Sequence, residues 1–319
     1  MNSATKLGIY AVGLAVVFGG AAGVGKIVGP VGASAETASH DGGGHGGGNG
    51  GGHGGGGGGE TAHAPGGLQV SEDGYTLVPR ATDVTPGERT DFRFTINGPD
   101  GKPVTGFKLL HGKRVHLIVA RRDLSGFQHL HPTEAGGGVW TVPITLPKAG
   151  VYRVFTDVQP EGAKRQLTLG ADVFAQGELK TTPLPKPERV AKVDGYEVAL
   201  TGGLAPGKST ELTLTVSKDG KPVTDLEPYL EAYGHLVALR QGDLAYLHVH
   251  PDGAPGDGKT KPGPEITFFA EAPSTGAYRL YLDFKHGGKV RTAEFTVYAG
   301  DARAPVQTGG GHDDTPHTH

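Results

Sequence analysis

The hexapeptide DGKPVT at residues 100–105 occurs a second time, unchanged, at residues 219–224. Shorter matching strings accompany both copies in the same order: DGY at 73–75 and 194–196, PG at 86–87 and 206–207, and GVYR at 150–153 against GAYR at 276–279. Ordered matches at a nearly constant offset indicate an internal duplication. Each copy covers roughly 110 residues, which is the size of one domain and too long for one unit of a solenoid.

Both copies have the pattern of short strands. Apolar and polar residues alternate through 92–96 and 212–216, and again through 140–146 and 266–270. Gly- and Pro-containing turn sequences separate these stretches at short intervals, and no amphipathic helix of useful length is evident. The sequence therefore predicts an all-β fold with two tandem antiparallel β-sandwich domains. The spacing of the strands fits an immunoglobulin-like sandwich and a cupredoxin-like one equally well.

The composition shifts along the chain predict five segments. They are a signal peptide or membrane anchor at 1–35, a disordered Gly/His-rich linker at 36–67, the first repeat at 68–180, the second repeat at 188–300 and a disordered His-containing tail at 301–319. The sequence TTPLPKP at 181–187 contains three prolines and is the predicted connection between the repeats.

The N-terminus is typical of a targeting segment. Lys6 precedes the uncharged stretch 7–25, and Ala-Ser-Ala at 33–35 provides small residues suited to a signal peptidase. Cleavage before Glu36 would release a secreted protein, whereas retention of this stretch would anchor the chain in the cell membrane. Both alternatives place the repeats outside the cytoplasm.

The composition excludes several classes of protein. The chain has 319 residues and a net charge of -3, with no cysteine and one methionine. Disulfides and thiolate metal sites are therefore excluded, and no basic face for nucleic acid is indicated. The sequence contains no nucleophile elbow, zinc-protease motif, phosphate-binding loop or dinucleotide-binding motif, so we expect a protein that is not an enzyme.

Histidine is the residue type that stands out, with 15 in the chain. Seven of these lie in the linker and the tail, where Gly/His-rich sequence either binds divalent metals loosely or serves as a spacer. Within the repeats, three pairs occupy matched positions: His116 and His235, His129 and His248, and His131 and His250. His111 and His286 have no counterpart and are weaker candidates.

The spacing of the matched histidines indicates a metal site in each repeat. In a strand, the two histidines of a His-x-His motif lie on one face, because side chains alternate. A hairpin turn at 123–126 would bring His116 back beside His129 or His131. Three imidazoles suit Cu(II), Zn(II) or Ni(II), and the compartment favours Cu(II) slightly over Zn(II).

A matched pair of carboxylates provides a further candidate in each repeat. Asp157 and Asp283 are either fourth ligands or acceptors that fix the tautomer of an imidazole. A purely structural interpretation is that they form ion pairs with the nearby Arg153 and Arg279.

The strings HLIVARRDLSGFQHLHP at 116–132 and AGVYRVFTD at 149–157 resemble a group of secreted or membrane-anchored bacterial proteins, common in actinobacteria, whose function is unassigned. The resemblance covers both repeats and implies an extracytoplasmic location. The chain is also distantly similar to copper-resistance proteins of the CopC-like and YtkA-like type, in which an amino-terminal histidine binds copper. No histidine lies at the predicted mature terminus here, so this similarity implies only the class of fold and metal.

Two functions follow from these patterns. In the first, the chain is an extracytoplasmic protein that binds or buffers Cu(II) or another divalent metal through the matched histidines. In the second, it is a secreted or membrane-tethered immunoglobulin-like interaction module whose histidines are structural. The sequence does not identify a protein partner for either function.

Overall fold

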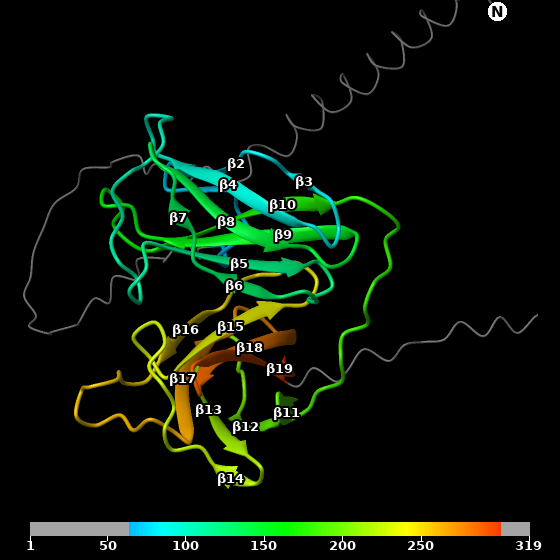
Figure 1. Cartoon of the computed structure of the whole chain (residues 1–319), viewed down its shortest axis with the longest axis vertical. Coiled ribbons are helices and arrows are strands. Elements are labelled where there is room, and N and C mark those ends of the chain that lie inside the picture. The colour runs from blue at the N-terminus through cyan, green and yellow to red at the C-terminus, as the bar shows by residue number, and fades with distance from the viewer. Residues whose placement is uncertain (1–63, 301–319) are drawn as a thin grey trace, which may run out of the picture. The chain divides into compact units, whose positions relative to one another are not determined.

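The strands of the two repeats follow one another along the chain, β1 to β10 in the first and β11 to β19 in the second (Figure 1). The computed structural model describes residues 64–300, and both repeats belong to one compact unit. The predicted targeting segment, nearly all of the Gly/His-rich linker and the tail lie outside the described residues. Within 64–300 there is no helix with the length and apolarity needed to span a membrane.

The first repeat is a sandwich of two five-stranded sheets with the orders β1-β2-β4-β8-β7 and β3-β10-β9-β5-β6. The strands of the first sheet are β1 Ser71–Glu72, β2 Tyr75–Pro79, β4 Arg89–Asn97, β8 Val139–Thr145 and β7 Thr133–Glu134. Those of the second are β3 Asp83–Val84, β10 Leu167–Ala175, β9 Gly150–Val158, β5 Val115–Arg121 and β6 Gln128–Leu130. All pairings are antiparallel except that of β3 with β10.

The second repeat is built in the same way. One sheet has the order β11-β12-β13-β17-β16, with β14 added beside β13, and the other has the order β15-β18-β19. The strands of the larger sheet are β11 Val190–Val193, β12 Tyr196–Gly202, β13 Ser209–Lys218, β14 Lys221–Pro222, β17 Glu265–Glu271 and β16 His248–Pro251. Those of the smaller sheet are β15 Gly234–Arg240, β18 Gly276–His286 and β19 Lys289–Ala299.

The alternating stretches form the cores, as predicted. Every apolar residue of the alternating positions in β4, β8, β13 and β17 is buried. Each sandwich has its own core, one centred on Phe94 and Trp140 and the other on Phe268 and Tyr278. The prediction of an all-β chain with two tandem sandwiches is confirmed for the described residues.

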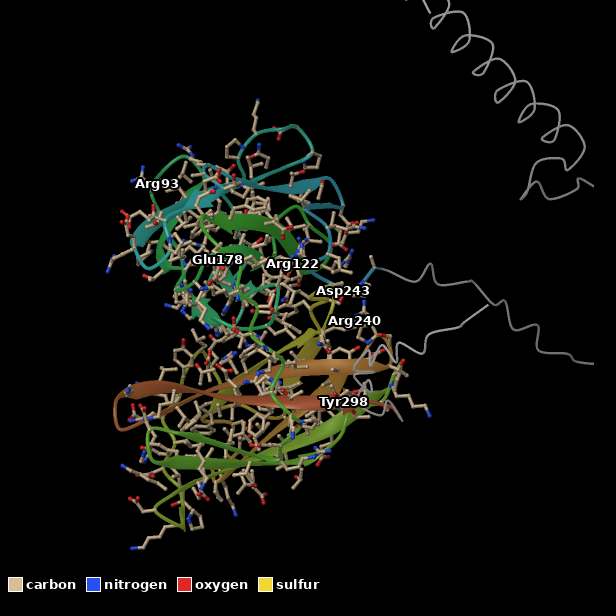
Figure 2. The ribbon with its side chains drawn as sticks, turned by 90° about the vertical axis from the view of Figure 1, so that its right-hand side faces the viewer. Arg93, Arg122, Glu178, Arg240, Asp243 and Tyr298 are labelled. Carbon is tan, nitrogen blue, oxygen red and sulfur yellow. The ribbon has the colours of Figure 1, made fainter. Side chains whose placement is uncertain are left out.

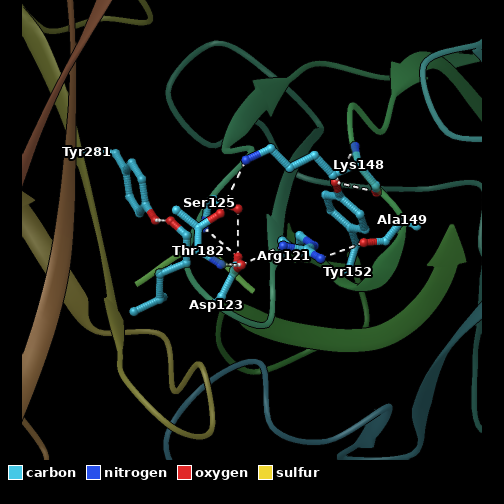
Figure 3. Close-up of polar contacts among 9 residues, drawn as sticks. Arg121, Asp123, Ser125, Lys148, Ala149, Tyr152, Thr182 and Tyr281 are labelled. Atoms are coloured by element: carbon cyan, nitrogen blue, oxygen red, sulfur yellow. Dashed lines mark hydrogen bonds and ion pairs between the residues drawn. The ribbon is translucent and has the colours of Figure 1, made fainter. Parts of the chain in front are cut away.

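Strand order and local contacts identify the sandwiches as immunoglobulin-like. In that fold a tyrosine near the start of one central strand bonds back to the backbone a few residues upstream. Tyr152 donates its hydroxyl to the Lys148 carbonyl at 2.9 Å, as Figure 3 shows, and Tyr278 donates to the Ser274 carbonyl at 2.8 Å. The same corner in both repeats fixes how β9 and β18 enter their sheets.

An arginine–aspartate pair holds the hairpin turn after β5 and after β15. Arg121 pairs with Asp123 at 2.5 Å, and Asp123 also accepts the backbone N–H of Thr182 from the connection between the repeats at 2.7 Å (Figure 3). Figure 2 shows Arg240 beside Asp243 in the corresponding turn of the second repeat, where their hydrogen bond measures 3.0 Å. The turn predicted at 123–126 is therefore present, and it lies against the connecting segment.

Two strands are buried on both faces, and this brings the repeats together. On β5, Leu117 and Val119 belong to the core of the first repeat, whereas Ile118 and Ala120 belong to a third apolar cluster. That cluster also contains Val237 and Leu239 of β15, together with Phe155, Tyr281, Leu124 and Leu244. The outward faces of β5 and β15 are therefore packed against apolar residues of the other repeat and removed from water.

Aromatic contacts are repeated across this interface. The ring of Phe127 stacks on that of Tyr281 with centroids 3.9 Å apart, and the ring of Phe155 lies 5.8 Å from that of Tyr246. The Tyr281 hydroxyl donates to the Leu124 carbonyl at 2.5 Å. The two ring contacts correspond to each other under the duplication. In each, an aromatic residue from the hairpin of one repeat packs against an aromatic residue of the other repeat.

The backbone just before the first repeat also enters the interface. The Gly66 carbonyl accepts the Tyr246 N–H at 3.0 Å, and Gly67 has a φ of 74°. A Cβ atom on Gly67 would lie 2.3 Å from Phe155 Cδ1, so this position requires glycine for space as well as for its backbone conformation.

We therefore expect Gly67→Ala to destabilise the protein more than Gly87→Ala, which shares the positive φ of 78° but has no atom within 4 Å of the added methyl group. The strained conformation alone costs ~1–2 kcal/mol in both variants, and overpacking against Phe155 adds ~1–3 kcal/mol in the first. Denaturant unfolding of both variants measures the difference. Equal losses would contradict the close approach of Gly67 to Phe155.

Candidate metal centre

Strand register brings the three matched histidines of the first repeat onto one face. Ile118 of β5 pairs with His129 of β6, and Leu117 pairs with Leu130. Continuing this antiparallel register by one residue places His131 opposite His116. Paired residues point to the same side of a sheet, and Ile118 points toward the second repeat. His116, His129 and His131 therefore share the face of the sheet that lies in the interface.

The three rings converge as the sequence predicts. One ligand nitrogen from each of His116, His129 and His131 lies within 4.8 Å of the other two. The ring centroids are 5.5 Å apart for the first two histidines, and His131 lies 5.1 Å from His116 and 5.0 Å from His129. Three imidazoles at these separations can bind one ion after small side-chain movements.

Outward hydrogen bonds fix the tautomers of two of these rings. His116 donates from Nε2 to the Leu110 carbonyl at 2.7 Å, and His129 donates from Nδ1 to Asp283 Oδ2 at 2.8 Å. A neutral imidazole has one N–H, so the remaining nitrogens, His116 Nδ1 and His129 Nε2, both carry lone pairs. These two atoms face each other at 3.3 Å, where two lone pairs repel unless a cation or a proton lies between them.

The third histidine adds an unpaired nitrogen to the same place. His131 Nε2 is buried and has no hydrogen-bond partner among the described atoms. A buried polar nitrogen without a partner is costly, and such groups in native proteins usually contact water, an ion or a ligand. A metal ion would satisfy all three inward nitrogens at once.

Burial keeps two of these rings, those of His116 and His131, neutral at physiological pH. Loss of solvent is the main cause that lowers the pKa of His116, and the neighbouring His129 lowers it further. Burial and then His129 and His116 lower the pKa of His131 to about 3. Neutral imidazole is the form that binds a metal, so no proton has to be displaced from these two residues near pH 7.

The second repeat contributes one described histidine to the same region. Burial, and then the nearby His129, lower the pKa of His235 to about 4. Its Nε2 donates to the carbonyls of Tyr229 at 3.1 Å and Leu230 at 2.9 Å. This matches the outward bond of His116 and leaves the Nδ1 of His235 as an acceptor.

The other two histidines predicted as ligands in the second repeat, His248 and His250, are described only as positions in a strand. β16 carries His248 and His250 and pairs with β17, but the side chains of both histidines lie outside the description. A metal site formed by His235, His248 and His250 therefore stays a prediction.

The two candidate carboxylates differ in their partners. Asp283 accepts the Thr292 hydroxyl at 2.6 Å through Oδ1 and His129 through Oδ2. Asp157 accepts the matched Thr168 hydroxyl at 2.5 Å. Burial, and then the nearby Asp157, raise the pKa of the Tyr246 hydroxyl. Both carboxylates are buried near the interface, where they can accept hydrogen bonds and so orient neighbouring side chains.

The arginines proposed as alternative partners of these carboxylates bind elsewhere. Arg153 forms an ion pair with Asp172 at 2.9 Å, and Arg279 with Glu294 at 2.6 Å. Of the two unmatched histidines, His286 bonds to the Tyr196 hydroxyl at 2.6 Å on the far side of its repeat. His111 lies near the cluster.

Sequence reasoning missed the position of His111 and the cavity beside the rings. The ring of His111 lies 5.2 Å from that of His235 and 6.2 Å from that of His116. A cavity of about 80 Å³ lies between the repeats and is lined by these three histidines, His129 and Asp157 among others. An isolated histidine without a counterpart gave no signal in the sequence, because its neighbours come from both repeats.

The family described as "Domain of unknown function (DUF8832)" matches residues 69–174 and 191–301. The chain belongs to this family. Each repeat is one copy of the DUF8832 domain, which confirms the duplication inferred from the repeated strings. No curated protein matches the sequence.

Solved structures with similar segments include the adhesin FdeC of Escherichia coli, InvD of Yersinia pseudotuberculosis and a putative membrane-anchored protein of Corynebacterium diphtheriae. Their sequence identities are 16%, 13% and 13%, over 72%, 74% and 73% of this chain. The matches span 65%, 61% and 60% of the other chains, with TM-scores of 0.23, 0.24 and 0.21. Similarity at this level transfers no function, and these proteins lend no support to the distant CopC-like resemblance.

The lowered histidine pKa values predict a loss of stability on acidification. Unfolded histidine titrates near pH 6.5, whereas His235 and His131 titrate at about 4 and about 3 in the folded protein. Below about pH 6.5 the unfolded chain therefore binds more protons, so the free energy of unfolding falls as the pH drops from about 6.5 toward 4 and is fully present above 6.5. Denaturant unfolding with a chelator present measures this slope. His131→Leu should reduce it, and an unchanged slope would contradict the burial of His131.

Proposed function

We propose that this DUF8832 protein binds one Cu(II) or Zn(II) ion outside the cytoplasm through His116, His129 and His131. The observation that carries the proposal is the convergence of three imidazole groups, whose ligand nitrogens lie within 4.8 Å of one another. In the neutral rings, the outward bonds of His116 and His129 leave two of these nitrogens as acceptors, and the buried Nε2 of His131 has no hydrogen-bond partner among the described atoms. The family match shows that the domain is duplicated, but it assigns no function to the histidines.

The ligand set favours borderline divalent metals. Three neutral imidazoles suit Zn(II) and Cu(II), while Mg(II) and Ca(II) prefer oxygen ligands. Neither cysteine nor a methionine beyond Met1 is available for a soft Cu(I) site. Cu(II) has the higher intrinsic affinity for nitrogen ligands, so it is our first choice.

Binding or buffering is a better assignment than catalysis. A hydrolytic centre needs a general base near the metal. The described carboxylates at the site, Asp157 and Asp283, already accept hydrogen bonds from threonine hydroxyls. The location outside the cytoplasm rests on the uncharged stretch 7–25 and the small residues at 33–35.

A second candidate function is an immunoglobulin-like interaction or structural module in which the histidines only close the interface. The bonds of His116 to Leu110, of His235 to Tyr229, and of His129 to Asp283 are those that structural histidines would make. This function also agrees with the strand order and with the tyrosine corners. It does not account for the buried, unpaired nitrogen of His131.

Metal titration separates the two functions. We expect the full chain, with the seven histidines of 36–67 and 301–319 replaced by glutamine, to bind one equivalent of Cu(II) or Zn(II). His131→Gln should weaken this binding by more than about 100-fold, because it removes a ligand outright, while His286→Gln should leave it unchanged. Isothermal titration calorimetry or competition with a chelating dye measures the affinities.

Failure of this background to bind either metal stoichiometrically would establish the structural function instead. Two equivalents, one of them lost on His248→Gln, would extend the proposal to the second repeat. Equal effects of His131→Gln and His286→Gln would show that the binding site lies elsewhere.

A further inference from the structure

We propose that metal binding at the three-histidine site is coupled to docking of the second repeat onto the first, with Asp283 as the positioning residue. The inference rests on the proposed function. It concerns how the site is regulated, since all three ligands come from one repeat and the residue that orients one of them comes from the other.

The contact between His129 and Asp283 is unusual among the ion pairs of the protein. Their atoms meet at 2.8 Å, and each side chain is only 5% exposed. Among the side chains that the structure describes, this is the only histidine–, lysine– or arginine–carboxylate pair that joins the two repeats. Apolar residues of both repeats form the third cluster beside it, and the Tyr281 hydroxyl also bonds across to the Leu124 carbonyl at 2.5 Å, but that contact is neutral.

The second repeat holds the carboxylate in place without help from the first. Asp283 lies on β18 with His235 opposite it on β15 and Thr292 opposite it on β19. The Thr292 hydroxyl occupies Oδ1 and leaves Oδ2 for His129. Docking therefore presents a fixed acceptor to His129 Nδ1.

That acceptor decides which nitrogen of His129 faces the metal site. While His129 is neutral, the bond to Asp283 keeps its proton on Nδ1, and the lone pair on Nε2 points toward His116 Nδ1 at 3.3 Å. Without it, His129 can carry its proton on Nε2, which would place a hydrogen where the metal binds. The docked arrangement therefore has the higher affinity, and by linkage the bound metal stabilises docking by the same factor.

The duplication provides a matched control in Asp157. This carboxylate has the same threonine partner, because Thr168 corresponds to Thr292, and it lies opposite His116 on the neighbouring strand. No described hydrogen bond joins it to one of the three ligands, and the group of the other repeat whose pKa it raises is the Tyr246 hydroxyl. Asp157→Asn and Asp283→Asn thus make the same chemical change on the two sides of one interface.

We expect Asp283→Asn to weaken Cu(II) or Zn(II) binding by about 10- to 100-fold in the full-length background described above, and Asp157→Asn to change it much less. Nitrogen NMR of the imidazole groups provides a readout that a structural role would not move. His129 should carry its proton on Nδ1 in the metal-free parent and shift toward Nε2 in Asp283→Asn only. Equal affinities for the two variants, with an unchanged tautomer, would overturn the proposal.

Docking itself can be followed at one amide. The Tyr246 N–H bonds to Gly66 across the interface at 3.0 Å, whereas the next amide, Leu247, bonds within the second repeat to Ala238 at 2.9 Å. We expect saturating metal to slow hydrogen exchange at Tyr246 at least several-fold and to leave Leu247 nearly unchanged.

Leu239→Asp tests the coupling without touching a ligand. Leu239 is fully buried in the interface cluster and lies outside both sandwich cores. A charge there should separate the repeats, speed exchange at Tyr246 and weaken metal binding in the same direction as Asp283→Asn. Tight binding that persists in Leu239→Asp, with no metal effect at Tyr246, would refute the coupling and leave the proposed function standing. Absence of metal binding by the parent would refute both.

Discussion

The arrangement of the molecule depends on the apolar outer faces of β5 and β15, which must be removed from water. Ile118 and Ala120 on one strand meet Val237 and Leu239 on the other, and each of these residues is 4% exposed or less. Burying such side chains contributes ~1.5–3 kcal/mol for each of the larger ones. The same contact excludes water from the row of histidines on this face. Desolvation then favours the neutral form of His116, His131 and His235, whose nitrogens must find partners inside the protein.

The duplication has produced an interface that is symmetric in its packing and asymmetric in its chemistry. Phe127 and Tyr246 occupy equivalent hairpins and each contacts an aromatic ring of the other repeat. Only Tyr246 has a hydroxyl, which it brings near Asp157, and this carboxylate raises the pKa of the hydroxyl. Phe127 cannot do the same for Asp283, so this carboxylate is free to accept His129. The two repeats therefore carry the same aspartate–threonine pair and differ in whether the facing hairpin aromatic has a hydroxyl group.

The sequence predicted the elements within each repeat and missed what joins them. Period-two alternation identified β4, β8, β13 and β17, because one face of each meets a core and the other meets water. The hairpin spacing also predicted the convergence of His116, His129 and His131, which depends on local register alone. The bond between His129 and Asp283 joins residues 154 positions apart in different repeats, and no periodicity encodes such a pairing. The one available signal was the apolar run LIVA at 117–120 within β5, which is typical of a strand buried on both faces.

The direction of the hydrogen bonds distinguishes a binding site from a structural cluster. A structural set of neutral histidines lowers its energy by pointing donors at acceptors within the set. Here His116 Nε2 and His129 Nδ1 are bonded outward to Leu110 and Asp283, so in the neutral rings the two nitrogens that face each other are both acceptors. Protonating one ring would also relieve the repulsion between them, and burial lowers the pKa of His116 and so opposes protonation of that ring. A divalent cation is drawn to those lone pairs without adding a proton to any ring. The arrangement therefore costs free energy when the centre holds nothing and gains it when a metal binds, as expected of a site selected to bind one.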